Sequence, residues 1–265
     1  MTTFSPKTRY RIKGYLEAFI NELVEQSKNQ KIQQHRLNPF YTALMPEEIS
    51  KISALKRSLD RKVESTFTGI AFLVALEHHA EVKRHYDVEG YVSQAALEEI
   101  ERQVEFFEKA ADVGTKRPDF TAMILAALQA RKADDERFLR VRADLYIRKH
   151  NGEELFFEIK SPVPNKGQCV EVTQRILRFH LLRAQPRPRV QGYFAMAYNP
   201  YGSSRNDYEW SMARNYLPFD EGVLIGQEFW ELVGGPTAYE ELLDIYQEAG
   251  REKSKYIIDS LAFGF

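Results

Sequence analysis

RADLYI at residues 142–147 and LFFEIKS at residues 155–161 are separated by a short polar segment, and they set the expected architecture. Polar and apolar residues alternate along both stretches, which predicts two β-strands joined as a hairpin. Side chains two apart on a strand point to the same face, so Glu158 and Lys160 share one. The first strand adds Asp144. Two carboxylates beside a lysine are a suitable environment for a divalent metal ion.

The length of the turn determines whether the two acids can meet. A two-residue turn, Asn151-Gly152, would place Asp144 opposite Ile159, so that Asp144 and Glu158 lie on opposite faces. A three-residue loop that begins at His150 instead places Asp144 opposite Glu158, with Gly152 at the left-handed third position that such loops favour. Facing carboxylates are destabilising unless a cation lies between them. We therefore expect the three-residue loop, and a two-residue turn would exclude a shared site.

In that register the residues have distinct expected roles. Asp144 and Glu158 would hold one or two Mg²⁺ ions, with the carbonyl of Ile159 as a further oxygen ligand. Lys160 would orient or polarise an attacking water and offset developing negative charge. This pattern predicts metal-dependent hydrolysis of a phosphodiester. The competing interpretation is an ordinary solvated hairpin whose outer face carries charged residues.

Composition limits the remaining possibilities. The chain has 265 residues, 43% hydrophobic and 28% charged, with a net charge of −1, which suits one globular domain and neither suggests nor excludes nucleic acid. The single cysteine, Cys169, excludes an intramolecular disulfide and fits a reducing compartment. No stretch resembles a signal peptide or approaches the ~20 apolar residues of a membrane span. We expect a soluble, cytoplasmic protein with no membrane contact.

Hydrophobic periodicity predicts the other elements. Helices dominate the first half, with Ser93 and Asp119 as expected N-caps. After the hairpin we expect a helix over 168–184, a covered strand over 190–198 parallel to the second hairpin strand, a short strand over 222–226, and helices over 228–233 and 236–249. The expected class is α/β, with a mixed central sheet flanked by helices. A single domain, 1–265, would comprise a helical N-terminal region over 1–135, a catalytic hairpin and sheet core over 136–226, and C-terminal helices over 227–265.

Asp144, Glu158 and Lys160, followed by a helix and a parallel strand, resemble the PD-(D/E)XK nuclease superfamily, although Ala143 replaces the motif's proline. The stretches FEIKSPVPNKGQ at 157–168 and EFWELVGG at 228–235 are similar to the TdeIII/MjaII group of type II restriction endonucleases. This resemblance implies Mg²⁺-dependent double-strand cleavage at GGNCC-type sites. Superfamily members often add an acid from a preceding helix, for which Glu77 is the candidate and Glu64 its rival.

DNA contacts are expected from two segments. Lys166 and the helix N-terminus next to Gln168 suit a phosphate, and the loop from Tyr198 to Arg205, with Asn206 after it, offers groups for base edges. The plain alternative for each is an ordinary surface residue. Arg175, Arg178 and Arg183 are either phosphate contacts or a solvated helix face.

Three functions remain open on the sequence. The first is a homodimeric restriction endonuclease acting on double-stranded DNA at a palindromic site, with a cognate DNA methyltransferase as its functional partner. The second is a structure-selective repair or junction-resolving nuclease, and the third is a non-catalytic DNA-binding protein.

Overall fold

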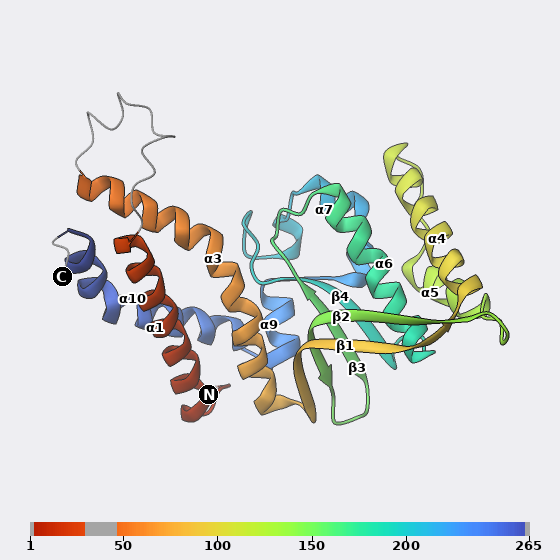
Figure 1. Ribbon diagram of the computed structural model, residues 1–265, viewed down its shortest axis with the longest axis horizontal. Coiled ribbons are helices and arrows are strands. Elements are labelled where there is room, and N and C mark those ends of the chain that lie inside the picture. The colour runs from red at the N-terminus through yellow and green to blue at the C-terminus, as the bar shows by residue number, and fades with distance from the viewer. Residues whose placement is uncertain (1–2, 30–46, 263–265) are drawn as a thin grey trace.

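A five-stranded mixed sheet forms the centre of the computed structural model, which describes residues 3–29 and 47–262 (Figure 1). The strands lie in the order β1-β2-β3-β4-β5. Antiparallel pairs join β1 to β2 and β2 to β3, whereas β3, β4 and β5 run parallel. Their bounds are Glu81–Ser93, Glu136–Arg148, Glu154–Ile159, Val190–Met196 and Val223–Ile225. The mixed α/β class is confirmed.

Helices cover both faces of this sheet. One face packs against α3 and α9, with α1 and α10 behind them, and the other packs against α6, with α4 and α5 beyond it (Figure 1). The helices are α1 (Pro6–Asn29), α3 (Glu47–His78), α4 (Gln94–Asp112), α5 (Phe120–Gln129), α6 (Lys166–Arg183), α7 (Ser211–Tyr216), α8 (Phe219–Gly222), α9 (Gln227–Gly234) and α10 (Ala238–Ala262). Within the described ranges, no helix is both long and apolar enough to cross a membrane.

The strand β3 is the central strand of the sheet. Leu155, Phe156 and Phe157 are fully buried. Phe156 stacks on Phe179 of α6 on one face, and Phe157 packs edge-on against Phe229 of α9 on the other. Covered faces explain why this strand is almost continuously apolar. A charged side chain at its end is therefore held in a dry environment.

The hairpin between β2 and β3 has the expected three-residue loop. The amide of Lys149 donates to the carbonyl of Glu153 at 2.8 Å, and Gly152 adopts a left-handed φ of +87°. The predicted register is confirmed at the pair Leu145–Phe157. The strand pairing ends there, one position before Asp144 and Glu158 would face each other.

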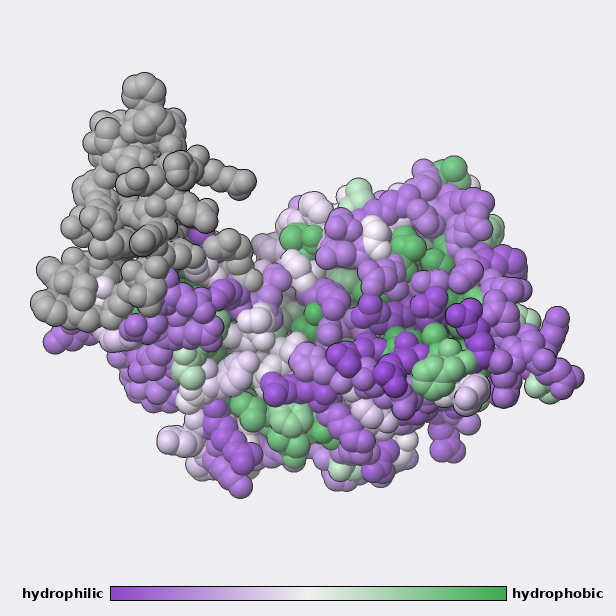
Figure 2. Space-filling view, in the orientation of Figure 1, coloured by the Kyte–Doolittle hydropathy of each residue, from purple (hydrophilic) through white to green (hydrophobic). Residues whose placement is uncertain are grey.

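The strand β1 is absent from the sequence prediction, which assigned residues 1–135 to a helical region. The sheet in fact begins at Glu81. Charged residues alternate along this strand on its outer side, where Asp87 pairs with Arg142 at 2.7 Å and Glu89 with Arg140 at 2.7 Å. Figure 2 shows hydrophilic residues over much of this side of the molecule. Apolar residues at 82, 86, 88 and 92 alternate with these charged residues, so the segment has a strand-like pattern that the prediction missed. The ion pairs, which depend on a strand about 50 residues away, add to the pairing of β1 with β2.

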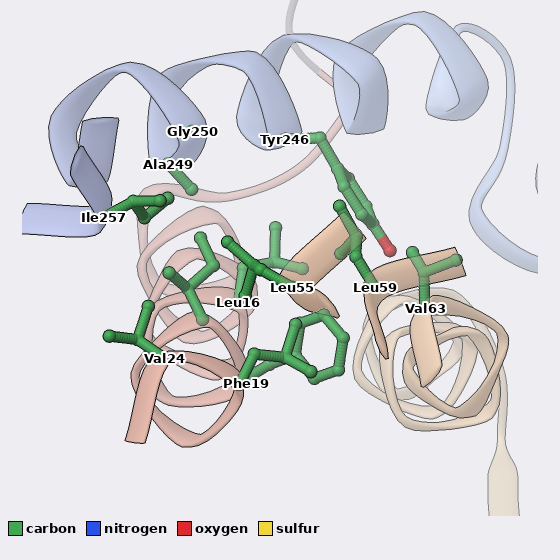
Figure 3. Close-up of a pocket in the computed structure, with 12 residues that line it drawn as sticks. Leu16, Phe19, Val24, Leu55, Leu59, Val63, Tyr246, Ala249, Gly250 and Ile257 are labelled. Atoms are coloured by element: carbon green, nitrogen blue, oxygen red, sulfur yellow. The ribbon is translucent and has the colours of Figure 1, made fainter. Parts of the chain in front are cut away.

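An apolar pocket of about 190 Å³ lies between α1, α3 and α10 (Figure 3). Leu16, Leu59 and Tyr246 are among the residues that line it, and its described lining includes no charged side chain. A site for phosphodiester chemistry needs charged ligands, so this pocket is unsuitable. The helix α10 extends to Ala262, beyond the expected end at 249, while Ser93 and Asp119 are N-caps as expected.

Candidate active site

The side chains of Asp144, Glu158 and Lys160 meet where β3 ends. Nζ of Lys160 lies 2.9 Å from Oδ2 of Asp144 and 3.4 Å from Oε2 of Glu158. The backbone N–H of Ile159 donates to the same Asp144 oxygen at 2.9 Å. One ammonium group thus contacts both carboxylates, as the three-residue loop predicts.

Backbone contacts fix the position of Lys160. Its amide donates to the carbonyl of Ala195 on β4 at 3.0 Å, which continues the parallel pairing for one residue past β3. The following loop is held by two aromatic side chains. The hydroxyl of Tyr208 donates to the carbonyl of Pro162, and the indole N–H of Trp210 donates to that of Pro164, both at 2.6 Å. Tyr208 is buried in the core and Trp210 packs against it, so both anchor the loop that leads from the site into α6.

Glu158 has an unusual environment for a carboxylate. Its side chain is 0% exposed, and Oε1 is buried without a hydrogen-bond partner. Burial, followed by the charge of Asp144, raises the pKa of Glu158 to about 7, despite the opposing effects of Lys160 and Arg175. A buried acceptor without a partner is costly in free energy, so this oxygen is poised to accept a cationic ligand.

Lys160 remains a cation in this setting. Burial alone would lower its pKa, but the neighbouring carboxylates of Asp144 and Glu158 outweigh that effect and raise the pKa above its ordinary value. A protonated lysine donates hydrogen bonds and offsets negative charge.

The donor set fits a hard divalent ion such as Mg²⁺. Carboxylate oxygens of Asp144 and Glu158 lie on either side of one cationic group, and Oε1 of Glu158 lacks a partner. Among the described residues, no group of three or more His, Cys, Asp or Glu side chains could hold a metal. Mg²⁺ retains several of its waters and needs few protein ligands, so two carboxylates and a backbone carbonyl suffice.

A strained position in β1 lies across from Asp144. The register places His85 opposite it, and His85 has a φ of +48°, which a non-glycine residue rarely adopts. Tyr86 of β1 pairs with Ala143 of β2, yet the ring of Tyr86 lies 4.5 Å from that of Tyr146 on the same face of the sheet. Ala143 and Tyr146 are three residues apart along β2. Strict alternation would separate residues three apart. The strands therefore change side-chain direction next to the candidate acid, a feature without a sequence signal.

Glu77 does not lie at this site, which corrects the expectation. Its Oε1 accepts a hydrogen bond from the amide of Ser5, at the start of α1, at 3.0 Å. The helix α3 ends beside Arg148, because β1 begins with the pair Glu81–Arg148. Asp144 is four residues from Arg148, or about 14 Å along the strand. Glu77 instead holds the N-terminus of α1.

The rival acid, Glu64, lies nearer the end of the sheet that carries Glu158 and Lys160. It precedes Phe67 by about one turn of α3, and the ring of Phe67 packs 6.1 Å from that of Tyr198. Tyr198 follows the end of β4, and Ala195 of that strand pairs with Ile159. The placement of Phe67 thus favours Glu64 over Glu77 as an acid supplied by the preceding helix.

The four expected DNA contacts have different environments. Lys166 pairs with Asp112 at 2.8 Å and with Glu108 at 2.9 Å, so a phosphate would have to compete with both. Oε1 of Gln168 accepts from the amide of Asn165, so Gln168 is the third helical residue of a capping box whose N-cap is Asn165. Asn206 is exposed.

Arg205 is a structural residue, contrary to its expected role at base edges. Its guanidinium donates to both carboxylate oxygens of Glu228, at 2.7 and 2.6 Å, and to the carbonyls of Phe219 and Val223. These bonds use all three guanidinium nitrogens. A bidentate contact with guanine would require breaking them.

Arg175 is the residue of the site that the sequence left undecided. Its Nη1 lies 2.7 Å from Oε2 of Glu158. The only hint was its spacing on α6, and the register of a helix over a strand cannot be derived from spacing alone.

Known proteins that are similar to this chain are type II restriction enzymes. The family model described as type II restriction endonuclease, HinfI, matches residues 8–250. The type II restriction enzymes HgiEI and HgiBI of Herpetosiphon aurantiacus are each 38% identical over 97% of this chain and 98% of their own. HgiCII of the same organism is 36% identical over 98% of this chain and 99% of its own. The finer similarity to the TdeIII/MjaII group is not shown. The chain belongs to the HinfI family of type II restriction endonucleases.

Proposed function

We propose that this chain is a Mg²⁺-dependent type II restriction endonuclease with a PD-(D/E)XK core, in which Asp144, Glu158 and Lys160 carry the hydrolysis of phosphodiester bonds in both DNA strands. The observation that carries the proposal is the buried Glu158. Its free Oε1 lies in a cluster with Asp144 and a protonated Lys160. Membership in a restriction endonuclease family supports DNA as the substrate.

Each residue has a defined task in this proposal. The carboxylates of Asp144 and Glu158, with the carbonyl of Ile159, would hold the divalent ion. When bound, that ion supplies positive charge beside the phosphate and lowers the pKa of its water. Lys160 donates hydrogen bonds that orient the attacking water and offset charge on the phosphate oxygens. The covered strand β3 keeps the carboxylate of Glu158 dry, which strengthens its electrostatic interactions.

We further propose that recognition is palindromic and that two copies of the chain act as a homodimer, because a two-fold DNA site matches a two-fold protein. A GGNCC-type sequence is the specific expectation. Asn206 is the exposed candidate for contact with DNA, and Glu64 the candidate helix acid. A cognate DNA methyltransferase would protect the host genome.

The test is incubation of the purified chain with plasmid DNA in Mg²⁺ or in EDTA, followed by sequencing of the fragment ends. We expect discrete fragments with one shared end sequence in Mg²⁺ and intact plasmid in EDTA. End sequences without a common motif would indicate a structure-selective nuclease. Intact plasmid under every condition would indicate a non-catalytic DNA-binding protein.

A further inference from the structure

Two arginine–glutamate pairs connect α6 to β3. Arg175 pairs with Glu158 at 2.7 Å, and Arg183 pairs with Glu154 at 2.9 Å. Phe179 lies between the arginines and stacks on Phe156, with ring centroids 4.7 Å apart and planes 15° apart. Spacings of two along the strand and four along the helix keep these residues on facing surfaces.

The two glutamates differ in how their oxygens are satisfied. Oε2 of Glu154 pairs with Arg183, and its Oε1 accepts a hydrogen bond from the hydroxyl of Tyr146 at 2.6 Å. Oε2 of Glu158 pairs with both Arg175 and Lys160, whereas its Oε1 has no partner. Both carboxylate oxygens of Glu154 thus have a partner, whereas Glu158 is held by one oxygen only.

The two terminal nitrogens of Arg175 have different partners. Its Nη2 pairs with Glu171, one turn earlier on α6, while Nη1 is directed at Glu158. Glu171 is mostly exposed, with a side-chain exposure of 61%, and Glu158 is fully buried. Because Nη2 is held by a residue of the same helix, the N–H groups on Nη1 have a fixed direction. The guanidinium can therefore orient the buried carboxylate with little loss of side-chain entropy.

We propose that Arg175 is a positioning residue: with Lys160 it holds Oε2 of Glu158 and thereby leaves Oε1 available to the divalent ion. This inference rests on the proposed function. Groups that orient a metal ligand change metal affinity when they are removed, typically by about 10- to 100-fold. A simple cationic neighbour would have the opposite effect, because removing its charge would strengthen metal binding. The sign of the change separates the two possibilities.

The experiment titrates Mn²⁺ into the DNA-free chain and follows free Mn²⁺ by electron paramagnetic resonance. Arg175→Met retains the aliphatic stem and removes the guanidinium, so we expect about 10- to 100-fold weaker Mn²⁺ binding. Arg175→Lys restores a cation and should recover some of the affinity. Arg183→Met is the matched control, because it removes the equivalent pair at the other end of β3, and its Mn²⁺ affinity should equal that of the wild type.

Unchanged or tighter Mn²⁺ binding by Arg175→Met would overturn the inference, as would an equal loss in Arg183→Met. Circular dichroism of each variant confirms that it is folded. The proposed function fails separately, if the wild type neither binds Mn²⁺ nor cleaves plasmid DNA. If the wild type cleaves and Arg175→Met retains full Mn²⁺ affinity, only the positioning role is lost.

Discussion

Lys160 and Asp144 are 16 residues apart in the chain, and their side chains meet at 2.9 Å because the hairpin loop sets the register of β2 against β3. The contact brings a cation against the acid expected to bind the metal. It also explains the dependence of the site on loop length, since a change of one residue would turn Asp144 away.

Substituting Lys160 with alanine should abolish most cleavage while the fold persists. The ammonium group offsets charge that develops on the phosphate, and removing one such group typically costs at least about 10²-fold in rate. Plasmid cleavage under single-turnover conditions measures the effect. Lys149→Ala is the control, because Lys149 pairs with Glu153 in the same hairpin at 2.9 Å but lies at its turn. Equal activity losses in the two variants would contradict the assigned role.

Removing the hydroxyl of Tyr208 should loosen the loop that follows Lys160. Tyr208→Phe leaves the carbonyl of Pro162 without its donor, so we expect the free energy of unfolding to fall by roughly 1–3 kcal/mol and cleavage to decrease. Urea denaturation and plasmid cleavage measure the two effects. Tyr201→Phe is the control, because Tyr201 packs against Tyr208 and is 39% exposed. A stable Tyr208→Phe variant would show that the loop does not depend on this bond.

Arg205 and Asn206 should separate stability from DNA contact. Lysine cannot donate to Glu228, Phe219 and Val223 at once, so Arg205→Lys should lower the free energy of unfolding by about 2 kcal/mol. Asn206→Ala should leave stability unchanged and weaken DNA binding. Thermal unfolding measures the stability of each variant, and a gel-shift assay in EDTA measures its DNA binding. An Arg205→Lys variant with normal stability and altered sequence preference would restore base readout as its role.

Stability should fall in mildly acidic solution because of His180. Burial lowers the pKa of His180 from 6.5 to about 4, so between these values the unfolded chain binds a proton that the folded chain does not. The contribution of His180 to the free energy of unfolding is therefore fully present above pH 6.5. It is lost as the pH falls toward 4, and the loss amounts to about 3 kcal/mol.

Urea denaturation at several pH values tests this prediction. The slope of the free energy of unfolding against pH should decrease in His180→Gln, because glutamine does not titrate in this range. His150→Gln, at the exposed hairpin turn, is the control and should retain the wild-type slope. An unaltered slope in His180→Gln would assign the acid sensitivity to other groups.

The sequence alone determined the central hairpin and the identity of its charged residues. Alternation along 142–147 and the apolar run that opens 155–161 specify two strands, and a glycine at the third loop position specifies the register, because these signals are local. The helix and parallel strand that follow were predicted for the same reason. Ser93 and Asp119 were identifiable as caps because a cap requires only its own helix.

Tertiary structure alone decided the environment of these residues. The strand β1 pairs along its length with β2, a partner that the periodicity of residues 81–93 does not reveal. Glu77 and Arg205 have the residue types of a nuclease site, yet their partners are Ser5 and Glu228. The buried, half-satisfied state of Glu158 depends on how α6 lies over β3. Burial and pairing are properties of neighbours far apart in the chain, and these properties turn an acid-x-lysine pattern into a candidate active site.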